Sequence, residues 1–82
     1  MATAVQTQPI AKLSSADVLR IAQLDAEIAY RSDMKEYRVT LVLMSDGWHV
    51  DYDLIDPRLH GGGPHYVIDP TTGDILHKRY EQ

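Results

Sequence analysis

The chain of 82 residues contains no cysteine and no phenylalanine. Without cysteine, neither a disulfide nor a thiolate metal site can stabilise so small a domain. The core must therefore be built from tryptophan, tyrosine and aliphatic side chains, and a chain of this length has room for one such core. The apolar fraction of 44% and the charged fraction of 24% are those of an ordinary globular domain.

Positive charge is also scarce. The net charge is −4, whereas nucleic-acid-binding proteins usually carry a basic face, so a nucleic-acid partner is disfavoured. Residues 39–57 include four aspartates and no lysine or arginine. This acidic stretch has two interpretations: a surface that steers a basic partner, or a solvated strand face that maintains solubility.

Long apolar runs are absent as well. No run approaches the roughly 18 residues that a membrane-spanning helix needs. Residues 1–10 lack the basic start and the apolar centre of a signal peptide, so we expect a cytoplasmic protein. Residues 1–12 are polar and aperiodic, and we expect a disordered or loosely attached segment there, followed by a single domain over residues 13–82.

One amphipathic helix is predicted to begin at Ser14. Ser14 and Asp17 fit a capping box in which Asp replaces the usual Glu, and the helix should end between residues 30 and 33. Asp25 interrupts the apolar face. Because a buried unpaired carboxylate is costly, Asp25 is either a ligand-contacting acid in a cleft or a boundary residue bonded to a Tyr hydroxyl or a His. The apolar face comprises Val18, Ile21, Ala22, Leu24, Ile28 and Ala29.

Four strands in two hairpins are predicted after the helix. Residues 36–44 and 48–55 alternate between apolar and polar side chains around a tight turn at residues 45–47. In the second hairpin, the turn at residues 69–74 contains Pro70, which presets φ, and Gly73, which takes a positive φ. The last two residues are expected to fray. The predicted fold is α+β, with one N-terminal helix packed on a four-stranded antiparallel sheet. The side chains of the second strand that should face the helix are Trp48, Val50, Tyr52 and Leu54.

Three consecutive glycines, Gly61 to Gly63, precede the third strand. Glycine-rich loops can cradle a phosphate, but here no Lys-Ser/Thr pair and no helix follows. A conformational role is favoured instead. The glycines permit a bulge or a sharp bend, and they allow another backbone to come close.

Several acids and histidines are candidates for binding. His49, Asp51 and Asp53 share one strand face, and His60 and His65 flank the glycines. Residues spaced by two along a strand form a row and do not surround a point, so we expect neither a metal nor a cofactor. No nucleophile motif is present, and we expect no enzymatic activity. The predicted partner-binding residues are Asp51, Asp53, Asp56, His60 and His65.

The capped helix, the strand with Trp48-His49-Val50 and the stretch from Gly61 to Leu76 together resemble two groups of proteins. One is the short NTF2-fold (cystatin-like) immunity proteins of bacterial polymorphic toxin systems, which share the Trp-x-Val strand, the Gly-Gly segment and Gly-x-Ile-Leu. The other is the PepSY-like domains, which share the Asp-x-x-Thr-Gly-x-Ile-Leu hairpin. The resemblance covers about residues 14–80, without the extra helices that form the pocket of a full NTF2 domain.

The first resemblance implies a protein that binds and neutralises a cognate toxin in the cytoplasm, and the acidic stretch suits a basic toxin. The second implies an inhibitory or regulatory contact with a peptidase. Two alternatives stay open from the residues alone. One is a small-ligand or metal-binding domain in which Asp25 and the histidines face a cleft between helix and sheet. The other is a homodimer through the outward-facing Val42 and Met44.

Overall fold

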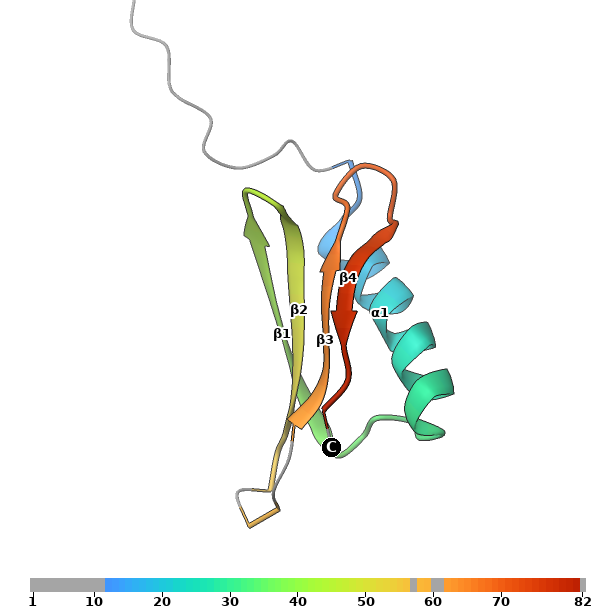
Figure 1. Cartoon of the computed structure of the whole chain (residues 1–82), viewed down its shortest axis with the longest axis vertical. Coiled ribbons are helices and arrows are strands. Elements are labelled where there is room, and N and C mark those ends of the chain that lie inside the picture. The colour runs from blue at the N-terminus through green and yellow to red at the C-terminus, as the bar shows by residue number, and fades with distance from the viewer. Residues whose placement is uncertain (1–11, 57, 60–61, 82) are drawn as a thin grey trace, which may run out of the picture.

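The computed structural model describes residues 12–56, 58–59 and 62–81. Each strand pairs antiparallel with the next, in the order β1-β2-β3-β4. The single helix lies against one face of this sheet (Figure 1), so the predicted α+β fold is confirmed. No helix in the described part of the chain is long and apolar enough to cross a membrane. The elements in order are α1 (Ser15–Tyr30), β1 (Tyr37–Met44), β2 (Gly47–Leu54), β3 (Gly62–Ile68) and β4 (Ile75–Arg79).

The segment before the helix was predicted to be disordered or loosely attached. All of it except Lys12 lies outside the described residues. The amides of Lys12 and Leu13 donate hydrogen bonds to the carbonyl of Pro70, at 2.9 and 3.0 Å. The chain is therefore fastened to the β3–β4 turn immediately before α1 begins.

The capping box that the sequence predicts starts α1. The Ser14 hydroxyl accepts a hydrogen bond from the Asp17 amide, and the Asp17 carboxylate accepts one from the Ser14 amide. At the other end, Arg31 adopts a left-handed conformation with φ 51°, and its amide donates to the carbonyl of Glu27. Both ends of the helix are thus closed by hydrogen bonds within the segment.

The buried face of α1 is narrower than the sequence predicts. Val18, Ala22 and Ala26 are fully buried. Leu24 and Ile28, which were expected to face the sheet, are 56% and 78% exposed. The two alanines have short side chains, which let the helix lie close to the sheet and leave only a central strip covered.

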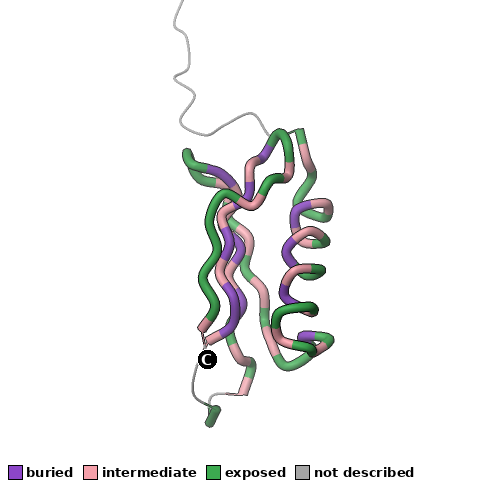
Figure 2. The backbone as a smooth tube through the Cα atoms, turned by 45° about the vertical axis from the view of Figure 1, so that its right-hand side comes forward, coloured by how far each residue is buried: buried purple, intermediate pink, exposed green. Residues whose placement is uncertain are grey.

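The core lies between α1 and the side of the sheet that it covers, called here the inner face. Val50 and Tyr52 of β2 and Tyr66 and Ile68 of β3 are buried there, and Trp48 packs against them. Figure 2 shows the buried positions gathered along the middle strands and the facing side of the helix. The prediction that Trp48, Val50 and Tyr52 face the helix is confirmed, whereas Leu54 is half-buried and lies outside this core.

Tyr52 places a hydroxyl in this core. The residue is 3% exposed, and its hydroxyl makes no hydrogen bond to any described residue. Because an unpaired buried hydroxyl costs free energy, we expect Tyr52→Phe to leave the free energy of unfolding unchanged or to raise it by about 1 kcal/mol. Tyr66→Phe is the matched control. It removes a hydrogen bond to Asp25, and should lower the free energy of unfolding by about 1–2 kcal/mol.

Urea unfolding at neutral and alkaline pH measures both effects. Burial, and to a lesser degree the charge of Glu27, raises the pKa of Tyr52 to about 12. In the unfolded chain the phenol of Tyr52 ionises near pH 10. The stability that Tyr52 contributes is therefore present below about pH 10 and is lost as the pH rises towards the folded pKa. Tyr52→Phe should therefore reduce the alkaline loss of stability. Equal destabilisation by the two Tyr→Phe changes at neutral pH would contradict the unpaired state of the Tyr52 hydroxyl.

The glycines were predicted to precede the third strand, but β3 begins at Gly62, so Gly62 and Gly63 lie within the strand, at a β-bulge. Asp51 pairs with His65, whereas Asp53 pairs with Gly62. Two steps along β2 therefore correspond to three steps along β3, and one extra residue is inserted into β3. This bulge is the feature that the sequence predicted for the glycines.

The close approach of another backbone occurs at Gly63. A Cβ atom on Gly63 would lie 2.7 Å from the Cβ of Tyr52 and 2.9 Å from its carbonyl oxygen. Pro64, which has no amide hydrogen to donate, is buried beside it in the bulge. Gly61 lies outside the described residues. The second and third glycines thus shape β3, and Gly63 is the one that has no space for a side chain.

Asp69 holds the turn between β3 and β4. Its carboxylate accepts hydrogen bonds from the amides of Thr72 and Thr71, at 3.0 and 2.7 Å. These bonds hold the pKa of Asp69 below its ordinary value. Gly73 has a φ of 83°, the positive value that the turn sequence predicts.

Candidate functional site

The face of the sheet opposite α1, called here the outer face, carries polar and charged side chains from all four strands. Side chains alternate between the two faces along each strand, so every second residue belongs to this face. Among the described elements, the one helix lies on the inner face (Figure 1). The residues of the outer face are Arg38, Thr40, Val42, Met44, His49, Asp51, Asp53, His65, Val67, His77 and Arg79.

The strand register arranges this face in two rows that cross all four strands. Neighbours in a row are directly paired residues, whose side chains are close enough to interact. One row, in strand order, is Thr40, Asp51, His65 and Arg79. The other row is Val42, His49, Val67 and His77.

His65 is held between two carboxylates. Its Nδ1 lies 2.6 Å from Oδ1 of Asp51, and its Nε2 lies 2.9 Å from Oε2 of Glu81. A ring nitrogen donates a hydrogen bond to the carboxylate that it faces when that nitrogen carries a proton. Arg79 donates to the same Glu81 oxygen at 2.9 Å. The four residues form a line across β2, β3 and the end of the chain in which acidic side chains alternate with His65 and Arg79.

The last two residues were expected to fray. This is wrong for Glu81, which hydrogen bonds hold in place, and Gln82 lies outside the described residues. The Tyr30 hydroxyl donates to the Glu81 carbonyl oxygen at 2.6 Å, and the Glu81 amide donates to the Tyr30 hydroxyl at 3.0 Å. The end of α1 therefore fixes the backbone of Glu81, while His65 and Arg79 fix its carboxylate.

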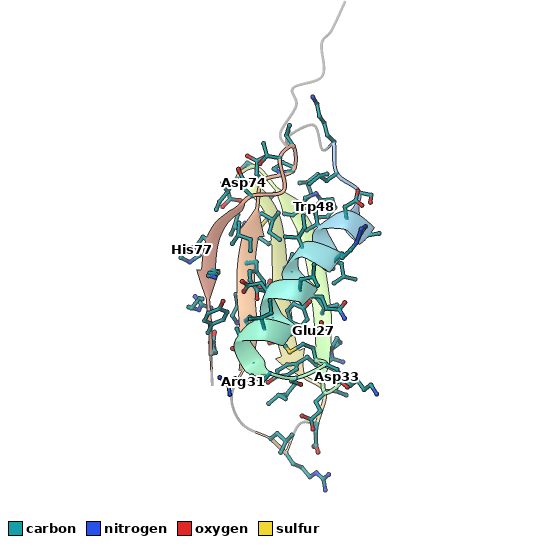
Figure 3. The ribbon with its side chains drawn as sticks, turned by 90° about the vertical axis from the view of Figure 1, so that its right-hand side faces the viewer. Glu27, Arg31, Asp33, Trp48, Asp74 and His77 are labelled. Atoms are coloured by element: carbon teal, nitrogen blue, oxygen red, sulfur yellow. The ribbon has the colours of Figure 1, made fainter. Side chains whose placement is uncertain are left out.

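A shallow hollow of about 230 Å³ lies beside this line. His49, His77 and Arg79 border it over Val67, together with Asp51 and His65. Figure 3 shows His77 projecting from β4 at the side of the sheet. The volume is below the roughly 300–1,000 Å³ of typical small-molecule pockets. The hollow therefore suits a single side chain from a partner better than a complete ligand.

His49 borders the hollow with one ring nitrogen already engaged. Its Nε2 lies 2.7 Å from Oδ1 of Asp46 in the β1–β2 turn. This hydrogen bond holds the pKa of Asp46 below its ordinary value. Two of the histidines on the outer face are thus oriented by aspartates of β2 or its preceding turn.

Three of the five predicted partner-binding residues lie together on the outer face: Asp51, Asp53 and His65. Asp56 follows β2, and its two carboxylate oxygens accept from Nε and Nη2 of Arg58 at 3.1 and 2.9 Å. This pairing holds the pKa of Asp56 below its ordinary value and leaves the carboxylate already neutralised by a neighbour. His60 lies outside the described residues.

Asp25 lies on the opposite side of the sheet and does not meet the outer-face histidines. Its carboxylate accepts hydrogen bonds from the hydroxyls of Tyr80 and Tyr66, at 2.7 and 2.8 Å, and from Nζ of Lys78 at 3.2 Å. Burial by itself raises the pKa of Asp25, but the three donors outweigh it and the pKa falls below its ordinary value. Bonding to tyrosine hydroxyls is one of the two arrangements considered for this acid.

Sequence reasoning missed the contribution of β4 to the outer face. His77, Arg79 and Glu81 occupy alternate positions, the same spacing that identifies His49, Asp51 and Asp53 on β2. That spacing shows that the three residues share a face, but the bulge between Ile75 and His77 decides that this face is the outer one.

Among residues 12–56, 58–59 and 62–81, no group of three His, Asp or Glu side chains could hold a metal ion. Comparison of the chain with protein-family models, curated proteins and solved structures gives no match. The candidate site is therefore defined by its geometry, as an open sheet face with fixed charges.

Proposed function

We propose that this chain is a non-enzymatic protein-binding module that holds a basic partner protein on its outer face. The observation that carries the proposal is the fixed line of Asp51, His65, Glu81 and Arg79 on a sheet face that α1 leaves open. Charged groups that are held in place before binding lose little conformational freedom on binding.

The contacts of His65 favour a recognition role over catalysis. A general base needs a ring nitrogen that is free to accept a proton from the substrate. Both nitrogens of His65 already face carboxylates, Asp51 on one side and Glu81 on the other. The imidazole therefore links two acids and fixes their orientation.

The charge of the outer face favours a basic partner. Asp51 and Asp53 belong to this face, and Asp46 and Glu81 lie at its borders, against Arg38 and Arg79 as the arginines of the face. Asp53 is exposed and makes no ion pair with any described residue, so its carboxylate is available to a partner. Together with the resemblance to immunity proteins, this favours an inhibitor that neutralises a basic toxin in the cytoplasm.

Charge reversal at Asp53 tests this proposal. Asp53→Lys places a like charge against a basic partner, and we expect the amount of partner captured from an extract of the source cell to fall about tenfold or more. Asp33→Lys is the matched control, because Asp33 is an exposed acid in the α1–β1 loop, away from the outer face (Figure 3). It should leave the capture unchanged.

Capture is quantified by mass spectrometry at low and at high salt, with melting temperatures to confirm that both variants fold. The captured protein should be basic, and raising the salt should weaken its binding to the wild-type chain. A partner that is retained equally by Asp53→Lys and by the wild-type chain would contradict docking on the outer face.

A further inference from the structure

The side of α1 that the sheet leaves uncovered carries large apolar side chains. Leu24 and Ile28 are 56% and 78% exposed, and Ile21 beside them is half-buried. Successive members of this set are three and four residues apart, so they lie on one side of the helix. Exposed apolar side chains gathered in this way are typical of a surface that another protein covers.

This apolar side points away from the sheet. The helix packs against β2 and β3, and Ala22 lies at the centre of its buried strip. At about 100° per residue, Leu24 and Ile28 lie about 160° and 120° around the helix from Ala22. A second helix can therefore contact both side chains without displacing the sheet.

Charged residues of both signs flank the apolar side chains. Asp17 and Arg20 lie before them and pair with each other at 2.9 Å. Glu27 and Arg31 lie in the last turn and at the end of the helix (Figure 3), and neither forms an ion pair with any described residue. The helix seam, as this side of α1 is called here, comprises Asp17, Arg20, Ile21, Leu24, Glu27, Ile28 and Arg31.

We propose that α1 packs antiparallel against α1 of a second copy of this chain, about a two-fold axis beside Leu24. The two helix seams then form the interface of the dimer. This inference does not depend on the proposed function, because α1 lies on the inner face and the outer faces of both sheets stay open.

The apolar residues of the helix seam are self-complementary about this axis. An antiparallel pair with two-fold symmetry brings together residues that lie at similar distances on either side of the axis. Leu24 contacts Leu24 of the second copy. Ile21, three residues before Leu24, contacts Ile28 of the second copy, four residues after it. The exposed apolar surface of both helices is therefore removed from water at once.

The charges of the helix seam are complementary in the same arrangement. Arg20, four residues before Leu24, meets Glu27 of the second copy, three residues after it. Asp17, seven residues before Leu24, meets Arg31 of the second copy, seven residues after it. The two-fold axis repeats both contacts, so four contacts between opposite charges flank the apolar centre.

Charge also selects the antiparallel orientation. A parallel pair of helices would place each residue beside its own copy. Arg20 would then face Arg20, and Glu27 would face Glu27, and like charges at these flanking positions disfavour pairing. The sequence of α1 therefore suits a second copy of itself in one orientation.

Sedimentation equilibrium of the purified chain tests the dimer directly. One short helix from each copy buries less surface than a standard interface, so we expect a dissociation constant between about 10 µM and 1 mM. A wild-type chain that stays monomeric up to about 1 mM would overturn the proposal.

Ile28→Lys tests whether the helix seam is the interface. It places a charge in the apolar centre and should weaken dimerisation about tenfold or more. Because Ile28 is 78% exposed in the single chain, the fold should not change. Val42→Lys is the matched control on the outer face, where Val42 is 46% exposed, and it should leave dimerisation unchanged. If Val42→Lys weakens the dimer as much as Ile28→Lys does, pairing through α1 is wrong.

Two charge variants test the orientation. Glu27→Arg places like charges opposite Arg20 of the second copy, and Arg20→Glu places like charges opposite its Glu27. Each variant alone should dimerise about tenfold or more weakly than the wild type. An equimolar mixture should form a heterodimer with an affinity near that of the wild-type dimer, because opposite charges then face each other again.

Melting temperatures confirm that each variant folds. Variants that dimerise as the wild type does when alone, or that stay monomeric when mixed, would contradict the antiparallel pairing. Should a charge variant fail to fold, the wild type, Ile28→Lys and Val42→Lys still decide whether α1 forms the interface.

Discussion

Gly63→Ala is expected to lower the free energy of unfolding by about 3 kcal/mol, a large fraction of the stability of a domain this small. The added methyl group would lie 2.7 Å from Cβ of Tyr52, 2.9 Å from its carbonyl oxygen and 2.9 Å from Cδ1 of Tyr37. Contacts this short are strongly repulsive, so β2 and β3 would have to separate at the bulge.

The atoms that the added methyl group would contact cannot easily move away from it. The Cβ and the carbonyl oxygen of Tyr52 move only with the backbone of β2, which is paired on both sides with β1 and β3. The tyrosine ring of Tyr37 could turn away, but it packs edge-on against Tyr30 and Tyr52. A rotamer change therefore cannot make room for the methyl group.

Gly62→Ala is the matched control, since it adds the same methyl group to the preceding residue. Its Cβ would lie 3.1 Å from Oε1 of Glu81, the far end of a flexible side chain. We expect a loss below about 1 kcal/mol. Urea unfolding of both variants measures the difference. Similar losses for Gly62→Ala and Gly63→Ala would show that backbone entropy, and not close approach, explains the glycines.

Features set by neighbouring residues were predictable from the sequence. The capping box needs only Ser14 and Asp17, and the β3–β4 turn needs Pro70 and Gly73 within six residues. The alternation of residues 48–52 identified the buried side of β2. In each case the residues that determine the structure lie within one turn or one strand, so their spacing contains the information.

Pairing across the outer face was not predictable, because two bulges change the register. Ile68 pairs with Ile75, so regular pairing would place His65 opposite Lys78. The bulge in β4 shifts this by one residue and places His65 opposite Arg79. A shift of one residue moves every later side chain to the other face. Alternation alone therefore could not align Arg79 and Glu81 with His65.

Contacts between distant parts of the chain were also beyond the sequence. Tyr30 and Glu81 are 51 residues apart and meet only because β4 returns along the end of α1. The exposure of Leu24 and Ile28 depends on how closely α1 approaches the sheet, which is determined by Ala22 and Ala26. Such distances follow from packing of the complete domain, and a periodic pattern does not contain them.

Asp25→Ala should lower the free energy of unfolding by about 3 kcal/mol and the melting temperature by about 10–20 °C. The carboxylate accepts three hydrogen bonds, from Tyr66, Tyr80 and Lys78, and so connects α1 to β3, β4 and the segment that follows. Without it, the hydroxyl of Tyr66, a residue that is 1% exposed, loses its partner inside the protein. A buried donor without a partner costs more than the hydrogen bond contributed.

Asp25→Asn separates the charge from the shape of the side chain, and its pH dependence provides a second test. Because the folded pKa of Asp25 is lowered, its charge stabilises the protein above the unfolded pKa of about 3.9, and this contribution is lost as the pH falls through the folded pKa. Asp17, Asp46, Asp56 and Asp69 also have lowered pKa values, so acid will destabilise the wild type through several groups at once. The difference in unfolding free energy between wild type and Asp25→Asn isolates the contribution of Asp25. That difference should be largest near neutral pH and shrink below about pH 4. A difference that stays constant down to pH 2 would show that the charge of Asp25 contributes nothing.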